Sequence, residues 1–236
     1  RTVKYGGNTS CVEVRLPSGQ LIILDAGTGI RELGNSLNYK EGGLDVTLLI
    51  SHYHWDHIQG LPFFRPAYHP NNIIRIMGIH HPEMHIEAII SAQMESIYFP
   101  VSLSYLKAEI KFHVMWEGSF DMGDIRVETS QAKHPGPTLS YRINFNGKSM
   151  VYMTDNELDR NLIDKKTGNR ERLDKAIALA RGADLLIHDA QYTDEEYPQK
   201  ITWGHSTWQD AAWLAMEAGA KRLALFHHDP ERSDRQ

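Results

Sequence analysis

The sequence is poor in cysteine, in long apolar runs and in positive charge. It contains a single cysteine, Cys11, so an internal disulfide is excluded and nothing indicates an oxidising compartment. No apolar stretch reaches the roughly 18 residues that a membrane-spanning helix needs, and no signal peptide is visible. We therefore expect a cytoplasmic protein with no membrane partner.

The charge balance argues against a protein that binds nucleic acid through its overall charge. Lys and Arg total 25 against 30 Asp and Glu, which gives a net charge of -5. A mildly acidic chain has no general attraction for polyanions, so bulk binding of nucleic acid is not expected. The chain starts at Arg1 in a strand-like pattern, and we expect a short strand to precede it.

Histidine, by contrast, is abundant, with 13 residues, several of them clustered. Histidine is the commonest metal ligand in proteins and the usual acid or base near neutral pH. A chain of 236 residues with 41% hydrophobic residues is long enough to bury a substantial core. The composition therefore favours a globular protein whose chemistry depends on histidine.

Apolar runs and turn signals predict a mixed α/β (α+β) fold in one domain, 1–236, with two packed sheets and helices outside. Strands are expected over 12–16, 21–24, 46–50, 73–78, 120–129, 139–145, 150–153, 183–188 and 222–226. Helices are expected over 30–37, 82–97, 173–181 and 207–218, and a polar loop over 161–171. In the last helix, Thr207 is a plausible N-cap and Gly219 a plausible stop.

One short motif, 51–57, concentrates ligand-type side chains after an apolar strand. It contains His52, His54, Asp56 and His57. In an extended chain a spacing of two places His52 and His54 on the same face, where both imidazoles can reach one ion. Asp56 and His57 follow the turn and can point at a second ion. The alternative interpretation is a polar loop with surface histidines, but such loops rarely hold so many ligand types.

Two metal ions need further ligands, and three candidates follow strands or lie in short loops. His134 lies between residues that restrain the chain, in Lys-His-Pro-Gly-Pro, whereas Asp155 and His227 each follow an apolar strand. Alone, each is more typical of a structural or exposed residue. Together they repeat one arrangement, with ligands at strand ends on a shared rim.

The order His-x-His-x-Asp-His, then His, Asp and His, resembles the metallo-β-lactamase superfamily over nearly the whole chain, including Leu24–Gly29. The resemblance implies a four-layer αββα sandwich. It implies that His52, His54 and His134 bind one metal, that Asp56, His57 and His227 bind a second, and that Asp155 bridges both. It also implies that Asp25 supports the ligand loop. Zinc suits the imidazole-rich set, while manganese or iron also fits the carboxylates.

Two features separate branches of the superfamily. Zinc β-lactamases carry a cysteine where this chain has Asp155, which disfavours that activity. The run Gly204-His205-Ser206-Thr207 resembles a motif of the ribonuclease Z and cyclic phosphodiesterase branch, in which the histidine assists at phosphate. The alternative, purely structural interpretation is that His205 and Thr207 only cap a helix.

Departures from ribonuclease Z narrow the expected substrate. The chain has Phe-His-His-Asp-Pro at 226–230 instead of a Thr-His-Phe-Ser type ending, and no glycine- and lysine-rich arm. We therefore expect a phosphodiesterase for a small or cyclic phosphodiester, such as a cyclic nucleotide, with Asp56 orienting the nucleophile and His205 acting at phosphate. A thioesterase or lactonase, or a non-catalytic metal-bound sensor, remains the alternative.

The segment 65–120 carries five more histidines and could wall the pocket, although we expect each to be a surface residue: His69, His80, His81, His85 and His113. His188 ends a strand and could support the site from behind, and His228 should point away from it. The sequence leaves open a homodimer.

Overall fold

The computed structural model describes residues 2–40, 43–158 and 169–234. The chain divides into two compact units. The amino-terminal unit comprises Asn8–Met115, and the carboxy-terminal unit comprises Arg1–Gly7 with Trp116–Gln236. The expectation that 1–236 forms one domain stays a prediction. Among the described residues, none of the helices combines the length and the apolar character that crossing a membrane requires.

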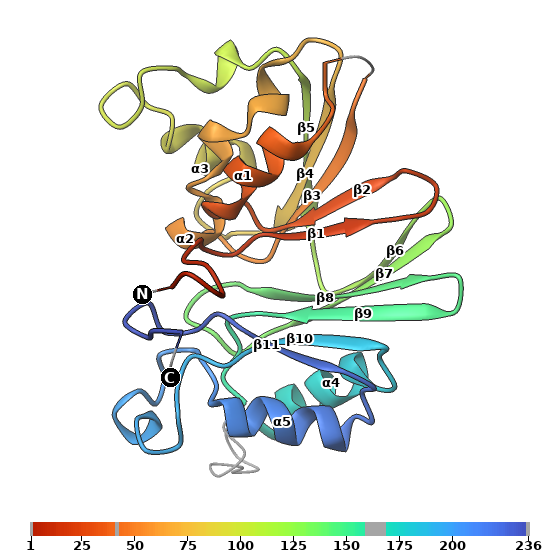
Figure 1. Cartoon of the computed structure of the whole chain (residues 1–236), viewed down its shortest axis with the longest axis vertical. Helices are drawn as coiled ribbons and strands as arrows, with labels where there is room; N and C mark the ends of the chain where they lie inside the picture. Colours follow the sequence, from red (N-terminus) through yellow and green to blue (C-terminus); the bar gives the residue numbers. More distant parts are fainter. Residues whose placement is uncertain (1, 41–42, 159–168, 235–236) are drawn as a thin grey trace. The chain divides into compact units, whose positions relative to one another are not determined.

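The amino-terminal unit is a five-stranded sheet with helices on one face (Figure 1). Its elements are β1 (Val12–Arg15), β2 (Leu21–Leu24), α1 (Gly29–Ser36), β3 (Asp45–Ile50), α2 (Trp55–Ile58), β4 (Ile73–Ile79), α3 (Ile86–Ala92) and β5 (Glu109–Met115). The strand order is β1-β2-β3-β4-β5, with β1 antiparallel and the rest parallel. Its core packs around residues such as Ile23, Leu48 and Ile76.

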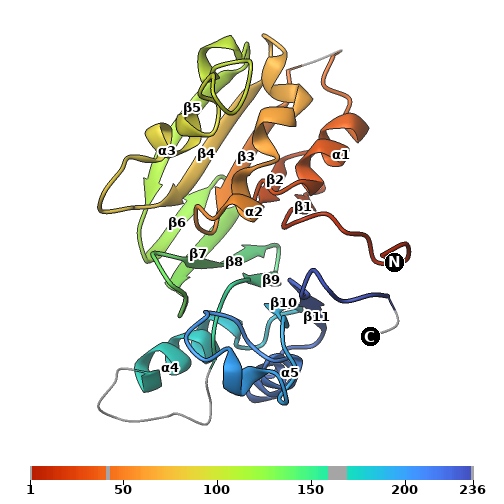
Figure 2. The same cartoon turned by 90° about the vertical axis from the view of Figure 1, so that its left-hand side faces the viewer.

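The carboxy-terminal unit is a six-stranded sheet with α4 and α5 on one face (Figure 2). Its elements are β6 (Gly118–Met122), β7 (Ile125–Gln131), β8 (Leu139–Phe145), β9 (Lys148–Met153), α4 (Asn169–Ala180), β10 (Leu185–Asp189), α5 (Trp208–Glu217) and β11 (Leu223–Phe226). The order is β11-β10-β9-β8-β7-β6, in which β9, β10 and β11 run parallel. Val151, Leu186 and Leu214 contribute to the core beneath the helices.

Strand direction decides where the loops of each unit gather. In the first unit β2 and β3 are parallel, so the turn after Leu24 and the loop after Ile50 leave the same edge. In the second unit β9, β10 and β11 are parallel, and β7 runs the same way because two antiparallel pairings separate it from β9. The loops after all four strands therefore meet at one edge of that sheet.

Most predicted elements are confirmed, and the differences have local causes. The strand expected over 120–129 is wrong: the segment is the hairpin β6–β7, which turns at Gly123 with φ of 62°. The helix expected over 82–97 is limited to α3, because His85 caps it by accepting a hydrogen bond from the Glu87 N–H. Strand β5 was not predicted. Of the expected loop 161–171, residues 161–168 lie outside the described residues, and residue 169 already begins α4.

Both predicted ends of the last helix are confirmed. Oγ1 of Thr207 accepts a hydrogen bond from the Asp210 N–H at 3.1 Å, which caps α5. At the other end Gly219 has φ of 65°, the left-handed conformation in which helices commonly stop. Thr207 is therefore a capping residue, and the role of His205, two residues earlier, has to be judged by its own contacts.

Candidate functional site

The first ligand set, which we define as His52, His54, Asp56 and His57, lies between β3 and the end of α2. Nε2 of His52 lies 3.0 Å from Nδ1 of His54. Two imidazole nitrogens bound to one tetrahedral zinc ion, each about 2.0–2.1 Å from it, are roughly 3.3 Å apart. The spacing of this pair therefore fits two ligands of a single ion.

A buried carboxylate orients His57. Its Nδ1 lies 2.7 Å from Oδ2 of Asp25, and neither side chain is exposed. Ser51 donates to the same carboxylate from its N–H at 2.7 Å and its hydroxyl at 2.8 Å. Since Nδ1 of His57 donates to Asp25, a metal would be bound at Nε2, which faces Oδ2 of Asp56 at 3.2 Å. Asp25 supports the motif, as predicted.

The turn after β2 packs against the ligand loop too closely for any side chain. A Cβ on Gly27 would lie 2.2 Å from the backbone oxygen of Asp56. The N–H of Ala26 donates to the His57 carbonyl at 2.7 Å. Asp25 itself has φ of 60°, an uncommon conformation for a residue other than glycine. The turn therefore fixes the backbone of the ligand loop as well as one imidazole.

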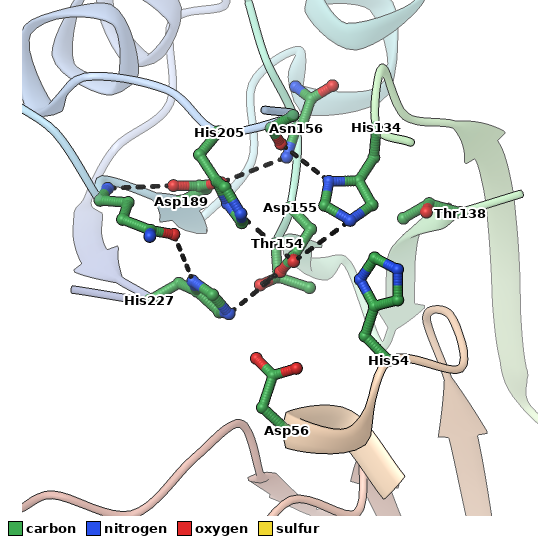
Figure 3. Close-up of polar contacts among 12 residues, drawn as sticks. His54, Asp56, His134, Thr138, Thr154, Asp155, Asn156, Asp189, His205 and His227 are labelled. Atoms are coloured by element: carbon green, nitrogen blue, oxygen red, sulfur yellow. Dashed lines mark hydrogen bonds and ion pairs between the residues drawn. The ribbon is translucent and has the colours of Figure 1, made fainter. Parts of the chain in front are cut away.

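The second ligand set, defined as His134, Asp155 and His227, comes together in the carboxy-terminal unit (Figure 3). Oδ2 of Asp155 lies 3.7 Å from Nε2 of His134, and Oδ1 lies 3.3 Å from Nε2 of His227. Each carboxylate oxygen thus faces a different histidine. That is the arrangement a carboxylate needs in order to contact two ions.

Backbone strain marks two members of the second set. Asp155, two residues after the end of β9, has φ of 47°, and His227, directly after β11, has φ of 54°. Left-handed conformations at residues other than glycine cost of order 1–3 kcal/mol and persist where the surrounding contacts impose them. The sharp turn at the end of each strand directs its side chain toward the same point.

Neighbouring groups determine which nitrogen each histidine of the second set presents. Nδ1 of His134 lies 3.0 Å from the Gly204 carbonyl, and Nδ1 of His227 lies 3.2 Å from Oε1 of Gln191. Both acceptors require the proton to be on Nδ1, so Nε2 is the nitrogen directed at Asp155. Deprotonated Nε2 atoms beside a carboxylate are chemically suited to hold a divalent metal ion.

His205 belongs to the same cluster and has its own carboxylate. Its Nδ1 lies 2.8 Å from Oδ2 of the buried Asp189 and 4.0 Å from Oδ2 of Asp155. Its ring stacks on that of His227 with 5.1 Å between centroids. Asp155, His205 and His227 offer ligand-type atoms within 4.8 Å of one another. His205 is therefore more than part of a helix cap.

Reasoning from the sequence named His188 as a residue behind the site but missed three others that support the second set, Asp189, Asn156 and Gln191. Asp189 stands out only when strand alternation is applied at the end of β10, since it must point to the opposite face from His188. His188 is buried behind the site, with Nε2 at 3.5 Å from Nδ2 of Asn156. Asn156 and Gln191 carry no signal in the sequence, because their partners are distant in the chain.

The histidines of the segment 65–120 do not form a metal site among the described residues. His80, His85 and His113 are exposed, as predicted, whereas His69 and His81 are half-buried. None of the five joins a group of three ligand-type residues. His228, next to His227, is exposed.

A family model described as a beta-lactamase superfamily domain matches residues 20–228. The chain belongs to the metallo-β-lactamase superfamily. The predicted fold class and family resemblance are thereby confirmed, and the chain is a metal-dependent hydrolase. The residues that bind its metals stay a prediction.

Similar proteins include ribonuclease Z from Thermoplasma acidophilum, which is 24% identical over 91% of this chain and 78% of that protein. Among solved structures, the short form of human tRNase Z aligns with a TM-score of 0.68 and 22% identity, over 94% of this chain and 86% of that one. A diphosphatase from the PhnP family aligns with a TM-score of 0.64 and 20% identity, over 95% and 75%. These similarities agree with the predicted ribonuclease Z branch.

Proposed function

We propose that this protein is a dinuclear phosphodiesterase acting on a small or cyclic phosphodiester, such as a cyclic nucleotide. The observation that carries the proposal is the pair formed by His205 and the buried Asp189 beside Asp155. A histidine whose Nδ1–H is held by a carboxylate is equipped to donate a proton from Nε2. The names of the similar proteins, a ribonuclease Z, a tRNase Z and a diphosphatase, favour chemistry at phosphate.

The ligands proposed for the two ions follow the family order. His52, His54 and His134 would hold one ion, Asp56, His57 and His227 the other, and Asp155 would contact both. Zinc is the ion that this imidazole-rich set favours, with manganese or iron as alternatives. When bound, the ions would lower the pKa of water and neutralise charge on phosphoryl oxygens.

The protein's own residues would orient the attacking water and transfer the proton. An oxygen of Asp56 would accept a hydrogen bond from the attacking water and orient it toward phosphorus. Nε2 of His205 would donate its proton to the departing oxygen. Asp189 would stabilise the charged imidazole while His205 carries the extra proton. Active-site groups of this kind typically contribute about 10²–10⁴-fold to the rate each.

Two side chains shortly before His205 in the chain, Lys200 and Trp203, favour a substrate that carries a nucleobase. Nζ of Lys200 lies 3.9 Å from the centroid of Trp203 and 5.7 Å from that of Tyr192. The Tyr192 ring in turn lies 6.0 Å from the ring of His205. Trp203 is 55% exposed, so part of its ring remains accessible beside the Lys200 ammonium group. An aromatic ring beside a cation suits a nucleobase with its phosphate.

The test compares substrates on the metal-replete protein. We expect turnover of bis(p-nitrophenyl) phosphate and of a cyclic nucleotide, and none of precursor tRNA, a thioester or a lactone. His205→Ala should lower kcat about 10²–10⁴-fold while two ions per chain are retained. His80→Ala, an exposed histidine outside the cluster, is the matched control. Faster turnover of the thioester or lactone contradicts the proposal, and no hydrolysis of any substrate favours a sensor.

A further inference from the structure

The turn that follows the second ligand set's aspartate connects two other loops of the carboxy-terminal unit. Oδ1 of Asn156 accepts from the Lys133 N–H at 3.0 Å, and the Glu157 N–H donates to the Lys133 carbonyl at 2.9 Å. The Leu158 N–H donates to Oγ of Ser206 at 3.0 Å. Residues 156–158 therefore hold the backbone on both the His134 side and the His205 side.

Glu157 has a buried carboxylate with several donors around it. Its side chain is 1% exposed. It accepts hydrogen bonds from the Tyr197 hydroxyl at 2.6 Å, the Thr202 N–H at 2.9 Å and the Gly204 N–H at 3.3 Å. Burying a carboxylate is costly unless such donors compensate for the lost water. The proposed reaction assigns this group no task, and no motif in the sequence singles it out.

The segment that Glu157 holds is conformationally unusual. Thr202 has φ of 74° and Gly204 has φ of 88°. The two N–H groups that Glu157 binds belong to these same residues. Since a left-handed threonine is disfavoured in a free chain, the two hydrogen bonds to the carboxylate, together with the bond from the Trp203 N–H to the Lys200 carbonyl, stabilise this path for 202–204.

The segment in turn abuts His134. The Gly204 carbonyl lies 3.0 Å from Nδ1 of His134, and a Cβ at position 204 would lie 2.2 Å from that nitrogen. A displacement of residue 204 would therefore remove the acceptor that holds the His134 proton. The connection runs from the Glu157 carboxylate through the Gly204 backbone to one imidazole.

We propose that Glu157 is a positioning residue: it fixes Gly204 so that His134 keeps its proton on Nδ1 and directs Nε2 toward Asp155. Partners of this kind typically change metal affinity 10–100-fold when they are removed. The proposal rests on the proposed function only in taking His134 as a metal ligand. It does not depend on which bond the enzyme hydrolyses.

The experiment compares two variants that disturb the same carboxylate. Glu157→Gln keeps the size and one acceptor oxygen. Because Tyr197 and Thr202 both donate to Oε1, the amide oxygen is expected to stay at that position, and the NH₂ group that replaces Oε2 then opposes the Gly204 N–H. Tyr197→Phe removes a different donor and leaves the contact with Gly204. We expect Glu157→Gln to lower the affinity for one of the two zinc ions 10–100-fold in a chelator competition. Tyr197→Phe should change that affinity less than about threefold.

A second readout does not involve metal or activity. In the metal-free protein, imidazole ¹⁵N shifts should show His134 as the Nδ1–H tautomer in the unmodified chain and in Tyr197→Phe. Glu157→Gln should show a mixture of tautomers. A purely structural role predicts that both variants lower Tm while the tautomer stays unchanged. Unchanged tautomer and zinc affinity in Glu157→Gln would overturn the proposal.

A pair of glycine variants decides the matter if Glu157→Gln does not fold. Gly204→Ala introduces a Cβ against His134, and Gly19→Ala, distant in the chain and within the amino-terminal unit, introduces one at a φ of 85° with nothing within 4 Å. Both variants carry the same kind of backbone strain, but only the Cβ at position 204 meets His134. Only Gly204→Ala should therefore lower zinc affinity and give a mixture of His134 tautomers. Equal effects of the two would reject the connection. The protein could bind two zinc ions, lose zinc affinity in Glu157→Gln and Gly204→Ala but not in the control variants, and yet cleave no phosphodiester. That result would refute the proposed function and leave the positioning role of Glu157 intact.

Discussion

The two units present their ligand-type residues in different ways. The amino-terminal unit provides four of them from one short segment, 52–57, which comprises a loop and the start of α2 and is supported mainly by the carboxylate of Asp25. The carboxy-terminal unit provides three from separate loops, and each has its own support: Gly204 for His134, Thr154 for Asp155 and Gln191 for His227. A contiguous set can depend on one supporting residue, whereas a dispersed set needs a network.

This difference determines how each set should respond to mutation. Loss of Asp25 removes hydrogen bonds to both Ser51 and His57, so it should disturb the first set as a whole. Loss of Gln191 removes only the contact to His227. Asp155 is the exception in the second set, because its two oxygens face two histidines. The predictions below test this comparison from the largest expected effect to the smallest.

Asp155→Asn should have the largest effect. It replaces one carboxylate oxygen by an amide group and removes a negative charge facing two histidines. We expect kcat/KM to fall at least 10³-fold, a loss of about 4 kcal/mol in transition-state stabilisation, and metal content to drop by about one ion per chain. Asp121→Asn, an exposed carboxylate in β6 of the same unit, is the control. Retention of two ions with full activity would remove Asp155 from the site.

Asp25→Asn should come next, and it tests the single-support side of the comparison. The change weakens the buried contact to His57 and leaves an amide against the Ser51 N–H or hydroxyl. We expect metal affinity to fall 10–100-fold and the free energy of unfolding to fall by about 1–3 kcal/mol, read by chelator competition and urea unfolding. Asp45→Asn, a half-exposed partner of Arg75, is the control.

Gln191→Ala tests the same comparison in the second set, whose residues are supported separately. It removes one support for one histidine of the dispersed set. Its loss of metal affinity should therefore be smaller than that of Asp25→Asn under identical conditions. An equal or larger loss would show that the two sets do not differ in how they are supported.

Trp203→Ala tests the base-binding role and replaces no residue of either set. We expect KM for a cyclic nucleotide to rise roughly tenfold, about 1.4 kcal/mol, with kcat little changed, because a stacked base is lost. Trp116→Ala, another exposed tryptophan of the same unit, should leave KM unchanged. An unaltered KM in Trp203→Ala argues against a base at this position.

The smallest effect should be a change in the pH dependence of stability. Burial lowers the pKa of His188, while Asp189 and Asp210 oppose the shift. Since the unfolded chain then binds a proton more readily than the folded one, stability falls as pH drops through about 6.5. His188→Gln should lose less stability than the unmodified chain between pH 7.5 and 5.5, measured by urea unfolding. Parallel losses would show that His188 does not titrate on unfolding.

The success of sequence analysis differed between elements for physical reasons. Strand β8 matches its predicted range, 139–145, because a segment that alternates apolar and polar residues ends in an Asn-Gly turn. The hairpin at Gly123 was missed because a single glycine in a strand pattern marks either a bulge or a turn. Strand β5 alternates over 109–115, yet its polar residues, among them His113, suggested a surface segment.

For the candidate site, the sequence by itself determined the ligand types and their order, and through the motif 51–57 it determined the first set almost completely. Local spacing suffices there, because four side chains share one loop. Only the tertiary structure decided which groups hold the dispersed residues: Asp189 behind His205, and Glu157 behind His134 through Gly204. Those contacts join residues far apart in the chain, and neither spacing nor periodicity records which loops the parallel strands bring together.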